Sequence, residues 1–358
     1  MVGEAGVGYP RARVGWGSRQ GEGAIERDNA PAWNGKPGHY EVWFVTLSDG
    51  HTAYWIRSTL HAPTGAAPEG RVWFARFDRD RPERILALNA AWPMGQVRDR
   101  PEPFEIQIGD SMFSSGRAAG RLSGEGHEVE WELAWPTGDE TLRLLPDALY
   151  RGGLAPTKPF SPNPATRFTG TVTVDGETAT LDGIPGQQGH LHGSKHAERW
   201  AWAHCSAFEG EDDVLLSAIS AQGRRGPFTT PYTTFAALRM NGRWIRLSRI
   251  SRKREQTLGA WRIDLGDRQY RLTGRVAADP SLIVRARYLD PDGTPRWCHN
   301  SEVASSRFVL FERRAGGFEE IASLSSVGTT HAEWAGRTPA PGEFVEHVEV
   351  GKTGEGPG

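Results

Sequence analysis

The stretch Glu128-Val129-Glu130-Trp131-Glu132-Leu133-Ala134-Trp135 alternates large apolar side chains with glutamates over most of its length. Successive side chains of a β-strand point to opposite faces, so this alternation predicts a strand with one buried and one solvated face. Such strands are typical of antiparallel sheets, because one face of these sheets can remain in water. The stretch therefore predicts an antiparallel sheet with Val129, Trp131 and Leu133 in its core.

The same signals recur along the chain. Alternating apolar and polar side chains occupy residues 104–108, 261–265 and 282–288. Turn sequences separate further strand-like runs and predict hairpins at Ser48-Asp49-Gly50, Asp175-Gly176 and Asn241-Gly242. No long segment has a clean helical period, so we expect an all-β fold class.

The composition agrees with this expectation and excludes several function classes. The 358 residues include 14 Trp, 44 Gly and 24 Pro, which indicates aromatic strands joined by turns. Lys plus Arg number 42 and Asp plus Glu 44, so no basic field favours nucleic acid or an anionic membrane. With two cysteines, no signal-peptide pattern and no apolar run of about 18 residues, we expect a reduced, cytoplasmic protein without an integral membrane segment.

An internal echo divides the chain into two halves. The strand-like pattern of residues 41–56 and 72–76 recurs about 155 residues later, in residues 200–219 and 235–239. Even the tripeptide His196-Ala197-Glu198 returns as His331-Ala332-Glu333. Coincidence among simple strand patterns is the alternative to two homologous β-domains. We expect a loosely ordered N-terminus (1–20), a first domain (21–160), a second domain (161–337), and a loosely ordered tail (338–358), with strands near 168–200 as an alternative completion of the first domain.

Histidines cluster in one segment, residues 186–206, which holds four of the 11 in the chain. If residues 196–208 form a strand, its two faces differ sharply in size and chemistry. Such a large, functionalised face suits an apolar ligand with one polarised end. The large face would carry His196, Glu198, Trp200, Trp202, His204, Ser206 and Phe208; the small face would carry Ala197, Arg199, Ala201, Ala203, Cys205 and Ala207.

Four interpretations of this segment are open. His190, His192, His196 and Glu198 are zinc-ligand types, but no recurring metal signature accompanies them, so we expect no metal. Cys205 is a poor nucleophile candidate, because its neighbour His204 would point to the opposite face. Acid–base chemistry fits better: Glu198 beside imidazoles and indoles could donate a proton, and the aromatic faces could stabilise a cation. Against this stands a purely structural role, with Glu198 paired to Arg199, Lys195 or another cation.

Several runs resemble the double-lipocalin superfamily, which includes carotenoid 1,2-hydratase, tocopherol cyclase-like proteins and lipocalin-like terpenoid cyclases. These runs are Tyr40–Phe44 with Ala53–Arg57, Pro156–Pro162, Gly186–Cys205 and Trp297–Ala304. The resemblance implies two lipocalin-like antiparallel β-barrels side by side. It also implies chemistry without a cofactor, in which a carboxylic acid protonates an isoprenoid alkene inside an aromatic pocket.

The resemblance also guides the choice of site residues. The family's His-Asp-His-Asn pattern aligns with His190-Leu191-His192-Gly193, so Leu191 stands where the family has its acid. Glu198 is therefore our first candidate for the acid, with Asp182 and Glu302 behind it, and His190, His192, His196 and His204 as relay or tuning groups. The expected substrate-binding residues are Trp200, Trp202, Trp43, Trp55, Phe208, Cys298 and Asn300.

These features predict a cyclase, hydratase or isomerase that acts on a hydrophobic, isoprenoid-like small molecule without a cofactor. A non-catalytic carrier of a lipid or pigment is the alternative, because the same pocket could hold a ligand without transforming it. The oligomeric state is left open.

Overall fold

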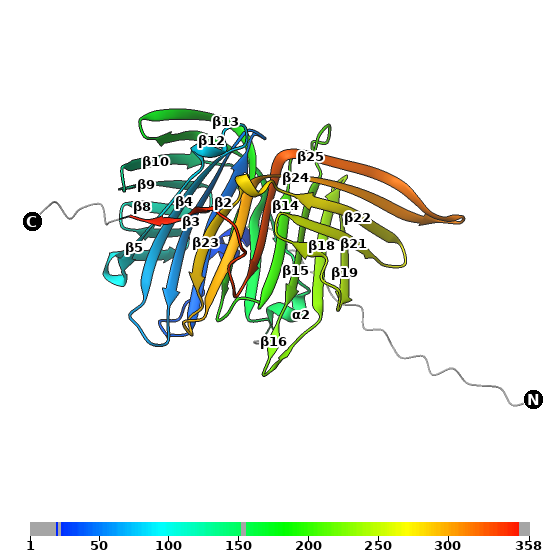
Figure 1. Ribbon diagram of the computed structural model, residues 1–358, viewed down its shortest axis with the longest axis horizontal. Helices are drawn as coiled ribbons and strands as arrows, with labels where there is room; N and C mark the ends of the chain where they lie inside the picture. The colour runs from blue at the N-terminus through cyan, green and yellow to red at the C-terminus, as the bar shows by residue number, and fades with distance from the viewer. Residues whose placement is uncertain (1–18, 21–22, 152–154, 351–358) are drawn as a thin grey trace, which may run out of the picture.

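The computed structural model describes residues 19–20, 23–151 and 155–350, and strands account for most of them. The strands form a 14-stranded sheet and an 11-stranded sheet, which lie side by side (Figure 1), and a two-stranded ribbon. Almost all strand pairs are antiparallel. The all-β fold class with two large antiparallel sheets is therefore confirmed. No helix in the described ranges is long and apolar enough to cross a membrane.

The first sheet is built from the N-terminal half of the chain and one C-terminal strand. Its strands are β1 (Arg19–Gln20), β2 (His39–Ser48), β3 (Thr52–Ala62), β4 (Glu69–Asp78), β5 (Leu86–Pro93), β6 (Val97–Pro101), β7 (Phe104–Ile108), β8 (Ser111–Ser114), β9 (Arg117–Gly124), β10 (His127–Ala134), β11 (Glu140–Arg143), β12 (Thr157–Val174), β13 (Glu177–Gly193) and β27 (Val348–Glu349).

The second sheet is built from the C-terminal half. Its strands are β14 (Arg199–Cys205), β15 (Leu215–Gln222), β18 (Tyr232–Met240), β19 (Arg243–Ser251), β20 (Gln256–Thr257), β21 (Ala260–Gly266), β22 (Tyr270–Ala277), β23 (Val284–Leu289), β24 (Pro295–Arg314), β25 (Gly317–Gly336) and β26 (Val345–Glu346). The ribbon and the short helices are β16 (Arg224–Arg225), β17 (Phe228–Thr229), α1 (Ala24–Asn29), α2 (Asp147–Tyr150), η1 (Pro82–Arg84), η2 (Met94–Gln96) and η3 (Pro280–Leu282).

Both sheets have the same strand order, as an internal duplication predicts. The first runs β5-β4-β3-β2-β13-β12-β10-β9, and the second runs β19-β18-β15-β14-β25-β24-β22-β21. In each sheet, a pair of long strands (β12 and β13, β24 and β25) returns to pair with the first strand of a meander. The change of sheet falls between Gly193 and Arg199. The division into domains at 160/161 stays a prediction.

Period-two patterning correctly predicts the two faces of the strands. Val129, Trp131 and Leu133 of β10 are buried in the core of the first sheet, and the intervening glutamates are exposed. The three expected hairpins join β2 to β3, β12 to β13 and β18 to β19. Asp175 and Asn241 adopt positive φ in their turns, a conformation that Asp and Asn tolerate better than most residues do.

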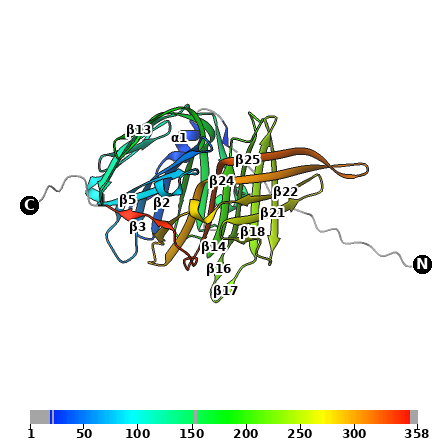
Figure 2. The ribbon, with the colours of Figure 1, turned by 45° about the horizontal axis from the view of Figure 1, so that its top comes forward.

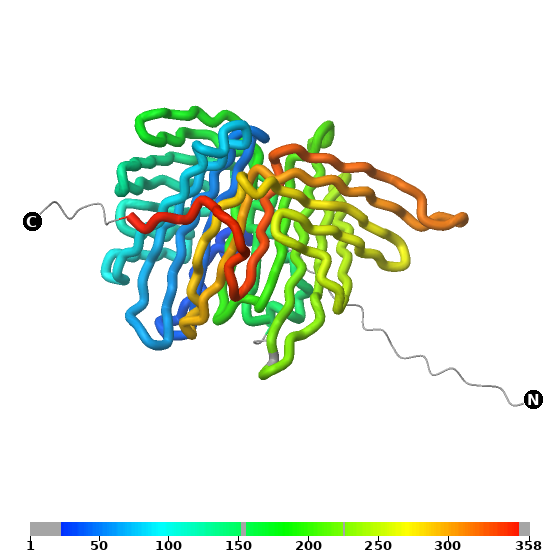
Figure 3. Tube along the Cα trace, viewed as in Figure 1, coloured from blue at the N-terminus to red at the C-terminus, as the bar shows by residue number. Residues whose placement is uncertain are grey.

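The C-terminal segment connects the two sheets. Val345–Glu346 pairs in parallel with β23 of the second sheet, and Val348–Glu349 pairs in parallel with β5 of the first. This red segment crosses between the sheets in Figure 2 and Figure 3. Part of the expected loose tail is thus strand-paired, and residues 351–358 lie outside the described residues. At the other end, residues 1–18 also lie outside them, and β1 pairs with β11.

A close backbone contact between the sheets leads to the first prediction. Gly328 of β25 has φ +77°, and a Cβ atom there would lie 2.1 Å from the carbonyl oxygen of Gly50. The side chain of Ser48 also donates a hydrogen bond to the carbonyl of Gly328 at 2.6 Å. We expect Gly328→Ala to lower the free energy of unfolding by about 2 kcal/mol or more, because it adds backbone strain and a clash.

Urea unfolding monitored by tryptophan fluorescence measures this change. Gly316→Ala is the matched control, because a Cβ at Gly316 has no heavy atom within 4 Å. A loss of stability that is equal in the two variants would contradict the inter-sheet contact.

Candidate functional site

An apolar cavity of about 220 Å³ lies between the two sheets, and we call it the interface cavity. Its position follows from the parity of β14: Ala201, Ala203 and Cys205 are buried in the core of the second sheet, so Trp200 and Trp202 face the first sheet. Aromatic and aliphatic side chains from both halves of the chain form its walls, as is usual for small-molecule sites. They include Phe44, Leu142, Leu144, Phe160, Leu191, Trp200, Trp202, Ile219, Phe235 and Tyr288.

Glu333 supplies a carboxylate to the wall of this cavity. It lies on β25 directly opposite Trp202 of β14. The indole Nε1 of Trp200 donates a hydrogen bond to Glu333 Oε2 at 3.0 Å, and Oε1 lies 3.7 Å from Nε2 of His331. The side chain of Glu333 is 13% exposed, so a molecule in the cavity can reach it.

Behind Glu333 lies a buried imidazole–carboxylate pair. His331 Nδ1 and Glu302 Oε2 are 2.6 Å apart, and both side chains are almost fully buried. Burial by itself lowers the pKa of His331, but the attraction and hydrogen bond of Glu302 outweigh burial and raise this pKa above its usual value. Asn300 Nδ2 donates to the other oxygen of Glu302 at 3.2 Å. Glu333, His331 and Glu302 thus form a chain that leads from the cavity into the protein.

A second buried pair lies in the first sheet. His190 Nδ1 donates to the carbonyl of Asp28 at 2.5 Å, and its Nε2 lies 2.9 Å from Glu41 Oε1. Burial acts to raise the pKa of Glu41, but hydrogen bonds from His190, His39 and the Ala32 amide lower it to about 2. His190 borders the interface cavity, and its ring stacks on Trp43, which is buried in the first core.

This depressed pKa gives the second prediction. A carboxyl with a lowered folded-state pKa contributes stability that is complete above its unfolded pKa and is lost as the pH falls. For Glu41 the window runs from about 4.5 down to about 2, and the contribution is on the order of 3 kcal/mol. We expect the unfolding free energy of Glu41→Gln to depend less on pH in this window than that of the unsubstituted protein.

Urea titrations between pH 2.5 and pH 6 test the expectation. Glu132→Gln serves as the control, since Glu132 is exposed and pairs only at the surface with Arg117. Parallel pH profiles for Glu41→Gln and the unsubstituted protein would refute it.

Glu198, the first expected acid, lies in an arginine cluster and does not line the interface cavity. Its carboxylate is 3.5 Å from Arg337, 3.6 Å from Arg296 and 3.9 Å from Arg224. The purely structural interpretation expected Glu198 to pair with Arg199, Lys195 or another cation. The observed partners are not those two sequence neighbours, but Glu198 is paired with cations all the same. The Glu198 carboxylate is thus held by arginines and lies outside the lining of the interface cavity.

The remaining expected histidines lie in three different places. His196 lines the interface cavity and stacks on Tyr40. Its Nδ1 lies 2.7 Å from Asp290 Oδ1. Burial lowers the pKa of His196 even though the Asp290 carboxylate acts to raise it. His204 donates from Nε2 to the carbonyl of Pro164, and burial lowers its pKa to about 3. His192 stacks on Phe160, and burial followed by repulsion from His190 lowers its pKa to about 4.

The expected substrate-binding residues also lie in different parts of the molecule. Trp200 and Trp202 line the interface cavity, and Cys298 is buried beside it among the side chains between the sheets. Trp55 packs edge-on against Trp73, and Phe208 belongs to the core of the second sheet. Asn300 holds Glu302, while Asp182, a lesser acid candidate, is exposed on β13.

Glu333 and His331 were not selected from the sequence. The available signal was the repeated tripeptide, since His331-Ala332-Glu333 echoes the segment that drew attention to Glu198. Within residues 23–151 and 155–350, no three His, Cys, Asp or Glu side chains gather in a group that could hold a metal ion.

Comparisons with known proteins address the family and the fold. Residues 165–336 match the family model described as tocopherol cyclase-like. Over 313 residues the chain is 29% identical to Rv0493c of Mycobacterium tuberculosis, called an uncharacterized protein, and the match covers 85% of this chain and 88% of that protein.

Two crystal structures share the fold. CghA matches with a TM-score of 0.55 and 10% identity, covering 89% of this chain and 97% of that one. NE1406 of Nitrosomonas europaea, provisionally called AttH, matches with a TM-score of 0.51 and 15% identity, covering 87% and 96%. The resemblance to tocopherol cyclase-like proteins is confirmed for residues 165–336, which contain Glu302, His331 and Glu333, and the two crystal structures share the fold of the chain.

Proposed function

We propose that the protein is a cyclase that protonates a hydrophobic, isoprenoid-like substrate in the interface cavity, with Glu333 as the proton donor. The observation that carries the proposal is a carboxyl group in an apolar, aromatic cavity, backed by the buried pair of His331 and Glu302. The tocopherol cyclase-like match over the same residues supports a cyclase over other acid-catalysed reactions.

The proposed reaction is an isomerisation that needs no cofactor. The carboxyl of Glu333 donates its proton to one alkene carbon, which leaves a tertiary cation on the other. Aromatic faces stabilise such a cation, and Trp202 and Phe235 line the cavity where it would form. A hydroxyl group of the same substrate then attacks the cation, and its proton returns to the Glu333 carboxylate. One C–H and one C–O bond form, while one O–H bond and the alkene π-bond break.

Three neighbours would prepare Glu333 for this role. The Trp200 indole holds one carboxyl oxygen, which leaves the other facing His331. The paired Glu302 fixes the orientation of the His331 ring through Nδ1. The arrangement resembles the supported general acids of other enzymes, in which a second group orients the first.

Turnover in D₂O tests the proposal with a panel of prenylated phenols, of which geranylhydroquinone is the first probe. We expect an isomer of the substrate that carries one carbon-bound deuterium, detected by liquid chromatography and mass spectrometry. Bound probes that are recovered unchanged and without deuterium would favour the alternative, a carrier of hydrophobic ligands.

A further inference from the structure

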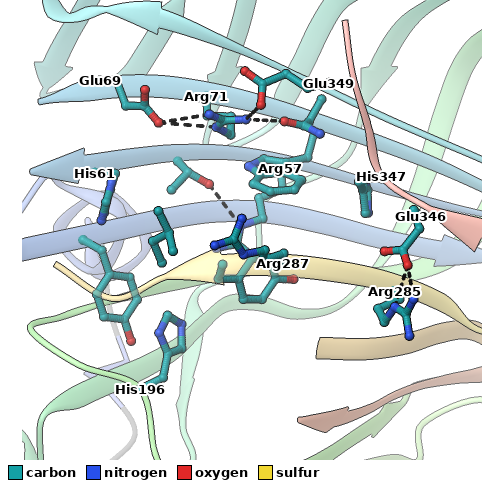
Figure 4. Close-up of a pocket in the computed structure, with 16 residues that line it drawn as sticks. Arg57, His61, Glu69, Arg71, His196, Arg285, Arg287, Glu346, His347 and Glu349 are labelled. Carbon is teal, nitrogen blue, oxygen red and sulfur yellow. Dashed lines mark hydrogen bonds and ion pairs between the residues drawn. The ribbon is translucent and has the colours of Figure 1, made fainter. Parts of the chain in front are cut away.

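A second cavity of about 300 Å³ adjoins the interface cavity and is rich in cationic side chains (Figure 4). Arg57, His196 and Tyr288 line both cavities, so these residues lie at the junction. We call the second space the cationic cavity. It is bounded by β3, β4 and β23 and by the C-terminal segment that carries Glu346 and Glu349.

Two of the four arginines that line the cationic cavity are already neutralised by carboxylates. Arg71 pairs with Glu69 at 3.2 Å and with Glu349 at 3.0 Å. Arg285 pairs with Glu346, as the dashed lines of Figure 4 show. These two cations therefore hold the wall together and offer little net charge to a ligand.

Arg57, unlike Arg71 and Arg285, has no carboxylate partner in the described part of the chain, and unlike Arg287 it is buried. The residue is only 6% exposed, and its Nε donates to Thr59 Oγ1 at 3.0 Å. Its guanidinium lies 4.3 Å from the centre of the Tyr288 ring and 5.6 Å from that of Trp55. Among residues 23–151 and 155–350, no Asp or Glu oxygen lies within 4.0 Å of its nitrogens.

A buried guanidinium in this setting is poised to bind an anion. Removing a cation from water is costly, and aromatic faces offset only part of that cost. The planar fork of N–H donors matches the two oxygens of a carboxylate or phosphate. The histidines His61 and His347 do not compete for an anion, because burial lowers the pKa of His61 and lowers that of His347 to about 3, so both rings are neutral at pH 7.

We infer that Arg57 is an anion-binding subsite, which holds the carboxylate or phosphate of an amphipathic ligand whose apolar part lies in the interface cavity. The inference rests on the proposed function for the position of the apolar part. It adds that the ligand is an acid rather than a neutral lipid. The exposed guanidinium of Arg287 borders the same cavity and strengthens its positive potential.

Calorimetric titration of the full-length protein with three probes tests the inference: geranic acid, geranyl phosphate and geraniol. They share one apolar part, so their affinities differ only through the head group. We expect at least one of the two anions to bind about tenfold or more tightly than geraniol at pH 7.5, as charge-assisted hydrogen bonds allow. Which anion binds better identifies the head group.

Substitution of Arg57 separates charge from shape. Arg57→Met keeps an apolar stem of similar length and should abolish the preference for the anion while leaving the affinity for geraniol unchanged. Arg57→Lys keeps the charge but loses the planar fork of donors, so it should retain part of the preference for the anion. This variant tests the role of Arg57 if the methionine variant fails to fold. Arg76→Met is the control, because Arg76 is a half-buried arginine of the neighbouring strand β4 that lies outside both cavities and donates to the carbonyl of Arg84.

Three results would overturn the inference: equal affinity for geraniol and the anions, an anion preference that survives Arg57→Met, or no binding of any probe. None of them decides whether Glu333 is the acid, since that is measured by deuterium incorporation. Conversely, an anion preference that depends on Arg57 in a protein without turnover would support the subsite and refute the cyclase.

Discussion

Glu333→Gln lowers the rate of cyclisation by about 10²- to 10⁴-fold and leaves substrate affinity within about threefold: this is the result we expect for the loss of a general acid. Gln preserves the shape of Glu and can accept the hydrogen bond from the Trp200 indole, so the walls of the interface cavity should remain in place. The measurement is single-turnover deuterium incorporation from D₂O, together with calorimetric binding of the same prenylated phenol.

Glu198→Gln is the matched comparison, because Glu198 is the carboxylate that the sequence favoured. It lies among Arg224, Arg296 and Arg337 and outside the lining of the interface cavity. We therefore expect a stability change but a rate within about threefold of the unsubstituted protein. A large rate loss in Glu198→Gln with normal turnover in Glu333→Gln would reverse the two roles.

Local patterning explains why so much of the fold is predictable. The faces of β10 and β14 follow from a period of two, which is a property of the strand itself. The hairpin turns follow equally from local residues, as at Asn241-Gly242. The repeated strand order also has a trace in the sequence, in the echo between the two halves.

The site was harder to predict, because long-range pairing builds it. The parity of β14 correctly places Trp200 and Trp202 on one face, but Glu198 precedes the strand and lies beside arginines from other segments. Glu333 reaches the cavity through the pairing of β25 with β14, two strands far apart in the chain. Period two describes one strand at a time and does not reveal which strand lies beside it.

The cationic cavity shows the same limit. Arg57 belongs to the run Ala53–Arg57, which carries part of the family resemblance, and nothing in that run marks its charge as unpaired. Its missing counter-ion becomes visible only when Glu346 and Glu349, from the C-terminal segment, are found paired with other arginines. A tail that looks polar and irregular in sequence can therefore close a cavity between two sheets.

Glu302→Gln should destabilise the protein strongly at low pH and more weakly at high pH. The carboxylate of Glu302 raises the pKa of His331 in the folded protein. A histidine with a raised folded-state pKa contributes stability that is fully present below its unfolded pKa of about 6.5 and is lost as the pH rises through the folded value. At pH 5.5 the variant would bury an imidazolium without its main partner, at a cost of about 3 kcal/mol.

The groups that face His331 determine how the experiment is read. Glu333 Oε1 at 3.7 Å remains as a second carboxylate, and the opposite His204 is neutral because burial lowers its pKa to about 3. Urea unfolding between pH 5.5 and pH 9 measures the cost at each pH, and the double variant Glu302→Gln/His331→Gln removes the titrating ring. We expect the double variant to regain part of the stability at pH 5.5 and to lose the pH dependence that the single variant shows relative to the unsubstituted protein. A cost of Glu302→Gln that stays constant across this range would mean that His331 is neutral throughout, and the chain from Glu333 to Glu302 would then orient the acid without carrying a charge.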